Sequence, residues 1–309
     1  MAGILEGVRR VNRPPFYAMT VNEARLAYVA ATEVLELPRA AVARLQDLII
    51  PASDGTPLRA RLYAGSQASN TPQARLPVLL YLHGGGFTIG NFETHDSLCR
   101  QLALRSGAAV VALEYRLAPE HRFPCAVLDS WAAMQWLALS GHALGLDSTR
   151  LAVGGDSAGG TLAAVSALRA RDIGLKLRLQ LLITPGTAAH ANSASHTTFA
   201  SGFLLEAAGI EWFFGHYIDH SQRTDWRFAP LLADSVDKVA PACVLLAECD
   251  PLVDEGVAYA DRLRAAGVPV ALEIYRGVTH DFIKMGRVVD EANSAQARAA
   301  EALTEAFAG

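Results

Sequence analysis

Short apolar runs alternate with longer helical stretches from about residue 45 onward. The runs at 77–82 (PVLLYL) and 179–183 (LQLLI) are almost continuously apolar, which is typical of strands covered on both faces. Strands separated by helix-length segments indicate a mostly parallel sheet with helices on both faces. We predict eight strands, at 45–51, 58–64, 77–82, 108–114, 150–155, 178–184, 242–248 and 269–275. We predict helices between them at 94–106, 125–143, 158–172, 253–266 and 288–307.

Two regions interrupt this alternation. Residues 1–44 predict a short first helix, then Pro14 and Pro15, then a second helix over 21–35. Residues 187–228 begin with a small, polar stretch and continue into an aromatic-rich helix over 203–217. An insertion of this length between strands is commonly a lid or a binding element. We therefore predict a single domain, residues 1–309, in which 1–44 and 187–228 form a helical cap over the carboxyl edge of the sheet.

Composition narrows the classes of protein that fit. The 309 residues are 51% hydrophobic and 19% charged, which suits one globular α/β domain, and the net charge is −4 without a basic run. Nucleic-acid binding is therefore not expected. Because we find neither a signal-peptide pattern nor a membrane-length apolar window, we expect no membrane contact and a cytoplasmic location. No cluster of His, Cys, Asp or Glu has metal-ligand spacing, so we expect no metal and no cofactor.

A serine between glycines follows the predicted strand 150–155. Gly155, Ser157 and Gly159 form G-x-S-x-G, and a predicted helix begins directly after it. In this context the glycines let a sharp turn close around an exposed nucleophile. The alternative is a glycine-rich turn that binds phosphate at a helix start, but a Gly-Lys-Ser/Thr or G-x-G-x-x-G pattern is absent here. We predict that Ser157 is a nucleophile.

A second glycine cluster, HGGGF at 83–87, follows the buried strand 77–82. Acyl transfer develops negative charge on the carbonyl oxygen, and losing one backbone N–H donor to that oxygen costs about 3–4 kcal/mol. Glycines let the backbone approach a substrate closely. A flexible loop is the alternative, but the two motifs together favour an oxyanion site beside a nucleophile.

The chain resembles the hormone-sensitive-lipase family of α/β-hydrolase esterases over roughly residues 45–285. The matching motifs are HGGGF at 83–87, YRLAPEHRFP at 115–124, GDSAGG at 155–160 and DPLVDEG at 250–256. The resemblance implies an α/β-hydrolase fold. It also implies that Gly85, Gly86 and Ala158 donate the oxyanion-hole N–H groups, and that His83 holds the glycine loop and is not the base.

An α/β-hydrolase presents its nucleophile, acid and base in the chain order Ser, Asp or Glu, His. Four of the nine histidines precede Ser157 and four lie in the predicted cap, which leaves His280 as the base. Asp250 directly follows a predicted strand; Asp254, at a helix start, is the alternative acid, and the resemblance agrees with Asp250. Asp281 stands where the family commonly has Gly. Whether this carboxylate raises the pKa of His280 or restricts its loop is open at this point.

The sequence indicates a carboxylesterase that forms an acyl-enzyme on small-molecule esters. Alternatives are an amidase, a lactonase or a deacetylase with the same triad; a catalytically silent ligand-binding homologue is disfavoured because His280 is present. The resemblance implies short acyl chains. The exposed edge strand at 269–275 could pair with a copy of itself, and the resemblance implies that a homodimer is plausible. The residues we expect to line the substrate pocket are Phe87, Phe203, Leu204 and Phe213.

Overall fold

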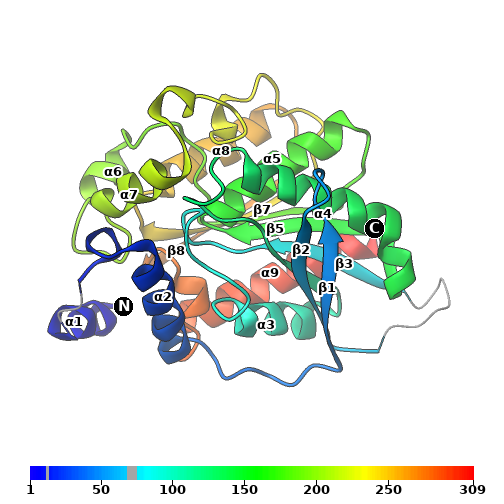
Figure 1. Cartoon of the computed structure of the whole chain (residues 1–309), viewed down its shortest axis with the longest axis horizontal. Coiled ribbons are helices and arrows are strands. Elements are labelled where there is room, and N and C mark those ends of the chain that lie inside the picture. Colours follow the sequence, from blue (N-terminus) through cyan, green and yellow to red (C-terminus); the bar gives the residue numbers. More distant parts are fainter. Residues whose placement is uncertain (12–13, 68–74) are drawn as a thin grey trace.

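A computed structural model describes residues 1–11, 14–67 and 75–309. In these ranges eight strands form one sheet in the order β1-β2-β4-β3-β5-β6-β7-β8 (Figure 1). β2 runs antiparallel to β1 and β4, and all other neighbours are parallel. The predicted α/β fold and its mostly parallel sheet are confirmed. The strands are β1 (Arg44–Pro51), β2 (Pro57–Ala64), β3 (Leu76–Leu82), β4 (Ala109–Glu114), β5 (Leu146–Asp156), β6 (Gln180–Ile183), β7 (Ala242–Cys249) and β8 (Val270–Thr279).

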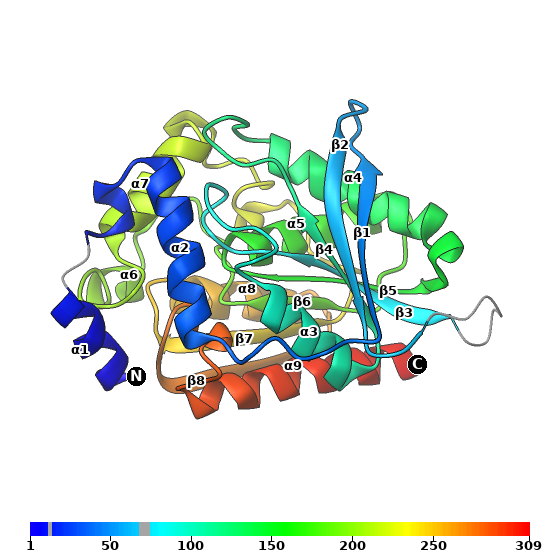
Figure 2. The same ribbon diagram turned by 60° about the horizontal axis from the view of Figure 1, so that its bottom comes forward.

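Helices cover both faces of the sheet (Figures 1 and 2). On β3, Leu80 and Leu82 pack in one apolar cluster, whereas Leu79 and Tyr81 pack in another on the opposite face. This alternation follows from the two-residue period of a strand. The first face carries α4 (Cys125–Ser140), α5 (Ala158–Asp172) and α8 (Val253–Ala265), and the second carries α3 (Asp96–Ser106) and α9 (Asp290–Ala308).

The helices of both predicted cap segments lie together at one end of the sheet, on the left in Figures 1 and 2. A buried cluster of Ala24, Tyr28, Ile89 and Phe213 joins the N-terminal segment to the later one. Residues 12 and 13, within the predicted segment 1–44, are outside the described residues. The helices here are α1 (Ala2–Val11), η1 (Phe16–Ala18), α2 (Val21–Leu35), α6 (Ala194–Thr198), α7 (Ala207–Tyr217) and η4 (His220–Gln222).

Several boundaries differ from the predicted ones. The aromatic helix α7 begins at Ala207, not at 203, because Gly202 adopts φ +83° and its N–H donates to the Glu206 side chain. Strand β5 begins at Leu146, where it pairs with Leu76 of β3. Helix α4 ends at Ser140 and is followed by the 3-10 turn η3 (Gly141–Leu144). Such ends depend on local turns that apolar periodicity does not report.

The edges of the sheet are β1 and β8. The sequence places an exposed edge strand at 269–275, and β8 carries Ile274 with 45% of its surface exposed. Pairing of this strand with a second copy of the chain stays a prediction. In the described ranges, no helix has both the length and the apolar character that crossing a membrane requires.

Candidate active site

Ser157 lies at a strained turn between β5 and α5. Its backbone adopts φ +54° and ψ −122°, which is rare for a residue with a side chain. A Cβ on Gly155 would lie against the carbonyl oxygen of Leu82 and 2.6 Å from the Gly159 backbone, and a Cβ on Gly159 would lie 2.7 Å from the carbonyl oxygen of His83. Backbone atoms cannot move aside as a flexible side chain can. The glycines of the motif are therefore steric requirements of this turn.

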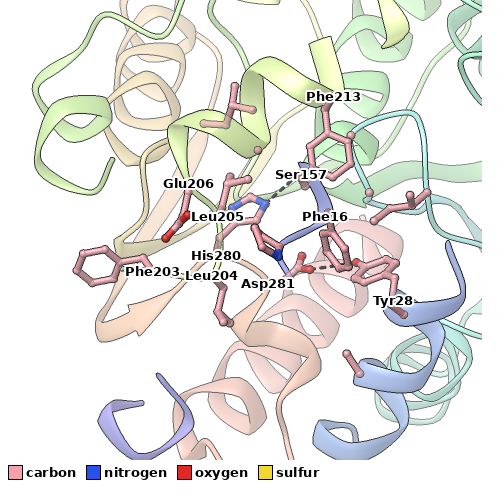
Figure 3. Close-up of a pocket in the computed structure, with 18 of the residues that line it drawn as sticks. Phe16, Tyr28, Ser157, Phe203, Leu204, Leu205, Glu206, Phe213, His280 and Asp281 are labelled. Carbon is pink, nitrogen blue, oxygen red and sulfur yellow. Dashed lines mark hydrogen bonds between the residues drawn. The ribbon is translucent and has the colours of Figure 1, made fainter. Parts of the chain in front are cut away.

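A chain of hydrogen bonds connects Ser157 to two residues at the ends of later strands. His280 Nε2 lies 2.9 Å from Ser157 Oγ (Figure 3), and His280 Nδ1 lies 2.7 Å from Asp250 Oδ2. Asp250, 1% exposed, follows β7, and its Oδ1 accepts a hydrogen bond of 2.9 Å from the Leu252 N–H. A hydroxyl, an imidazole and a buried carboxylate in this order form the arrangement that activates a serine nucleophile.

The electrostatics of His280 favour its protonated form. Burial lowers the pKa of the imidazole, but the charge of Asp250 and its hydrogen bond outweigh burial, and Asp281 and Asp156 add to the rise, to about 9. A base that receives a proton from Ser157 becomes an imidazolium. The carboxylates around His280 therefore stabilise the charge that proton transfer creates.

The other two acidic residues near this site contact different groups. Asp254 lies in the first turn of α8 and accepts a hydrogen bond of 2.8 Å from the Ser195 N–H. Asp281 accepts a hydrogen bond of 3.0 Å from the Tyr28 hydroxyl. Of the three acids that the sequence brings into question, Asp250 is the one hydrogen-bonded to His280.

The glycine loop after β3 presents backbone N–H groups beside Ser157. Gly85 and Gly86 adopt φ +116° and +57°, and a Cβ on Gly86 would lie against the ring of Phe213. In the described part of the chain, the N–H groups of Gly85, Gly86 and Ala158 donate to no protein acceptor. These three residues and Ser157 line one pocket. The loop can therefore offer several donors to one anionic oxygen.

A buried network beneath the loop fixes its position. Asp156, fully buried, accepts hydrogen bonds from the Tyr81 hydroxyl at 2.6 Å, the Gly84 N–H at 3.2 Å and the His95 ring at 3.1 Å. His83 Nδ1 lies 2.8 Å from the carbonyl oxygen of Gly84. Burial, with the charge of His95, lowers the pKa of His83 to about 3, so this ring is neutral. His83 thus belongs to the loop, and the imidazole hydrogen-bonded to Ser157 Oγ is that of His280.

A cavity of about 860 Å³ opens above Ser157. The four residues expected there, Phe87, Phe203, Leu204 and Phe213, all line it. Figure 3 labels the last three of them. Phe87 is 4% exposed and stacks on another ring, so it mainly forms the floor. Both predicted cap segments contribute walls, most of them apolar. A concave apolar pocket with a few polar groups suits a small organic molecule.

Some residues that hold the site were missed by sequence reasoning. Glu255 is buried, its carboxylate accepts the N–H groups of Thr187 and Ala188, and burial raises its pKa to about 8. It anchors the start of the 187–228 segment. An acidic residue in the first turn of a helix suggests an exposed cap, so its sequence context pointed away from this role. Tyr28 was missed too, because its partner Asp281 lies far along the chain.

Known proteins similar to this chain have the same fold and include ester hydrolases. Residues 79–284 match the family described as alpha/beta hydrolase fold. An ethyl acetate hydrolase of Pseudomonas putida is 42% identical, covering 94% of this chain and 92% of its own length. An esterase of Mycobacterium tuberculosis is 40% identical, with 87% and 85% covered.

Solved structures agree in fold along almost the whole length. An ester hydrolase from the metagenome of Lake Arreo, in complex with a phosphonate derivative, superposes with a TM-score of 0.93 at 38% identity, over 99% of this chain and 97% of that one. Both the sequence match and the shared fold cover far more than half of the chain. The chain therefore belongs to the α/β-hydrolase family, among the esterases of the hormone-sensitive-lipase type that its motifs indicate.

Proposed function

We propose that this protein is a carboxylesterase whose triad is Ser157, His280 and Asp250. His280 takes the proton of Ser157 as Oγ attacks the ester carbonyl, and then gives it to the departing alcohol. Water, deprotonated by the same imidazole, releases the acid from the acyl-enzyme and restores Ser157. Asp250 fixes the tautomer of His280 and stabilises its cation. The observation that carries this proposal is the hydrogen-bonded chain from Ser157 Oγ through the imidazole to the buried carboxylate.

The proposed oxyanion hole consists of the N–H groups of Gly85, Gly86 and Ala158. Support comes from their position in the pocket of Ser157 and from the lack of a protein acceptor for these donors within the described ranges. Donors held in place before the reaction cost no reorganisation when the carbonyl oxygen becomes negative. The network around Asp156 supplies that rigidity.

The proposed substrates are small-molecule esters with short acyl groups, bound under a cap formed by residues 1–44 and 187–228. The apolar cavity between these segments supports a neutral organic substrate. One relative is named for the hydrolysis of ethyl acetate, an ester with a two-carbon acyl group. The same triad could cleave amides, so the bond type is what an experiment must decide.

A substrate panel tests this proposal. We expect hydrolysis of p-nitrophenyl acetate and butyrate by wild type, with much slower cleavage of the matching p-nitroanilides. His280→Ala should lower ester turnover by about 10⁴-fold or more while the thermal melt stays near that of wild type. Faster cleavage of the anilides than of the esters would contradict the esterase proposal and indicate an amidase. Equal ester rates in wild type and His280→Ala would show that His280 is not the base.

A further inference from the structure

Helix α2 of the N-terminal segment contacts both of the loops that carry catalytic groups. Arg25 and Tyr28 are three residues apart, so they project from the same face of the helix. Arg25 reaches the glycine loop, and Tyr28 reaches the turn that holds His280. These two contacts join the oxyanion side of the site to its base through one rigid element.

The Arg25 guanidinium bonds to the backbone next to the glycine loop. Its Nε donates to the carbonyl oxygen of Thr88 at 3.0 Å, and its Nη2 donates to that of Ala118 at 2.9 Å. Thr88 in turn donates from its N–H to the Gly85 carbonyl and from its hydroxyl to the Gly86 carbonyl, both at 3.0 Å. Arg25 therefore stabilises the backbone that orients the proposed oxyanion donors.

Tyr28 meets the turn that follows His280 in a buried triangle with Asp281 and Lys284, of which Figure 3 shows the side between Tyr28 and Asp281. Its hydroxyl donates to Asp281 Oδ2 at 3.0 Å, the ammonium of Lys284 donates to the same hydroxyl, and Lys284 Nζ lies 3.3 Å from Asp281 Oδ2. Tyr28 is 7% exposed and the Lys284 side chain 5%. Asp281 holds φ +64° directly beside the proposed base. The triangle thus ties α2 to the residue that directly follows His280.

We propose that Arg25 and Tyr28 are positioning residues, through which α2 holds the oxyanion loop and the base turn in register for the reaction. This inference rests on the proposed esterase function and extends it, since the N-terminal segment then acts on turnover as well as covering the pocket. Catalytic groups tolerate errors of only a fraction of an ångström, and a 1 Å misplacement costs about 10²-fold in rate. Loss of either tie frees one side of the site without removing a catalytic group.

Two substitutions with a matched control test the inference. Tyr28→Phe removes only the hydroxyl, and Arg25→Met keeps most of the apolar stem; Leu26→Ala, at a 74% exposed position on the same helix, is the control. We expect kcat to fall about 5–50-fold in both variants with little change in KM. The factor should be the same for p-nitrophenyl acetate and butyrate, because a positioning defect does not depend on acyl size. Leu26→Ala should match wild type.

A pH profile separates a positioning defect from a change of charge beside the base. The Asp281 carboxylate stabilises the imidazolium of His280, so Asp281→Asn should lower the pKa of the base and move the acidic limb of kcat/KM to lower pH. Tyr28→Phe keeps that charge and should lower kcat without this move. The titratable and charged groups that face Asp281 and His280 from the packed elements are Tyr28, His95, Asp156, Asp250, Glu255 and Lys284.

The outcomes separate cleanly. If folded Tyr28→Phe and Arg25→Met both turn over within twofold of wild type, or if only KM rises, the inference is wrong. If either variant fails to fold, Arg25→Lys and Asp281→Asn are measured in place of Arg25→Met and Tyr28→Phe. Unchanged kcat at the pH optimum in both replacement variants also contradicts the inference. If folded wild type itself has no esterase activity, the proposed function is wrong.

Discussion

At the scale of single residues, the glycines of the site are explained by what surrounds them. Gly159 is the strictest case, because a Cβ there would overlap the carbonyl oxygen of Leu82 and approach that of His83. Those carbonyls belong to the end of β3 and the start of the glycine loop. One methyl group would therefore push the turn of Ser157 and the glycine loop apart.

We predict that Gly159→Ala lowers kcat/KM for p-nitrophenyl butyrate by about 10²-fold or more, because both sides of the site shift. Gly215→Ala is the control: its Cβ meets no atom within 4 Å, and it lies inside α7. That change should leave turnover unaltered and stabilise the fold by up to about 1 kcal/mol. Near-wild-type turnover in Gly159→Ala would contradict the claim that the turn cannot accommodate a Cβ at this position.

At the scale of elements, apolar periodicity predicted the regular parts and missed what depends on local turns. Helix α5 begins and ends where the sequence predicts, since the glycine motif marks its start. Helix α7 begins later than predicted because a glycine turn and a side-chain hydrogen bond precede it. The proposed triad rests on chain order and, for Asp250, also on the family resemblance. The contacts of Arg25 and Tyr28 could not be predicted from the sequence, because a helical pattern does not identify contact partners in a distant segment.

Helix α2 also depends on how it starts. Thr20 and Glu23 form a reciprocal capping box, in which the Glu23 carboxylate accepts the Thr20 N–H at 2.9 Å. Thr20→Ala should weaken the helix by about 1 kcal/mol, which corresponds to roughly fivefold faster hydrogen exchange of its amides by local opening. Thr20→Ser, which keeps the hydroxyl, should exchange as wild type does. Equal exchange in all three proteins would contradict this account of the helix start.

At the scale of the whole molecule, the sheet brings together residues that are distant in the chain. Ser157, Asp250 and His280 follow β5, β7 and β8, whose parallel carboxyl ends meet at one edge. Ligands of open α/β sheets bind at that edge. The helices of segments 1–44 and 187–228 lie at the same end of the molecule (Figure 2), so the pocket forms between the sheet edge and these helices.

The most direct measurement of the central claim is the intact mass of the folded protein after reaction with a fluorophosphonate. A serine activated by His280 displaces fluoride and gains one phosphonyl group, so we predict a single adduct, mapped to Ser157, in wild type. Ser157→Ala should gain no adduct, and His280→Ala should react far more slowly. Folded wild type without an adduct, or an equal adduct on Ser157→Ala, would contradict the account.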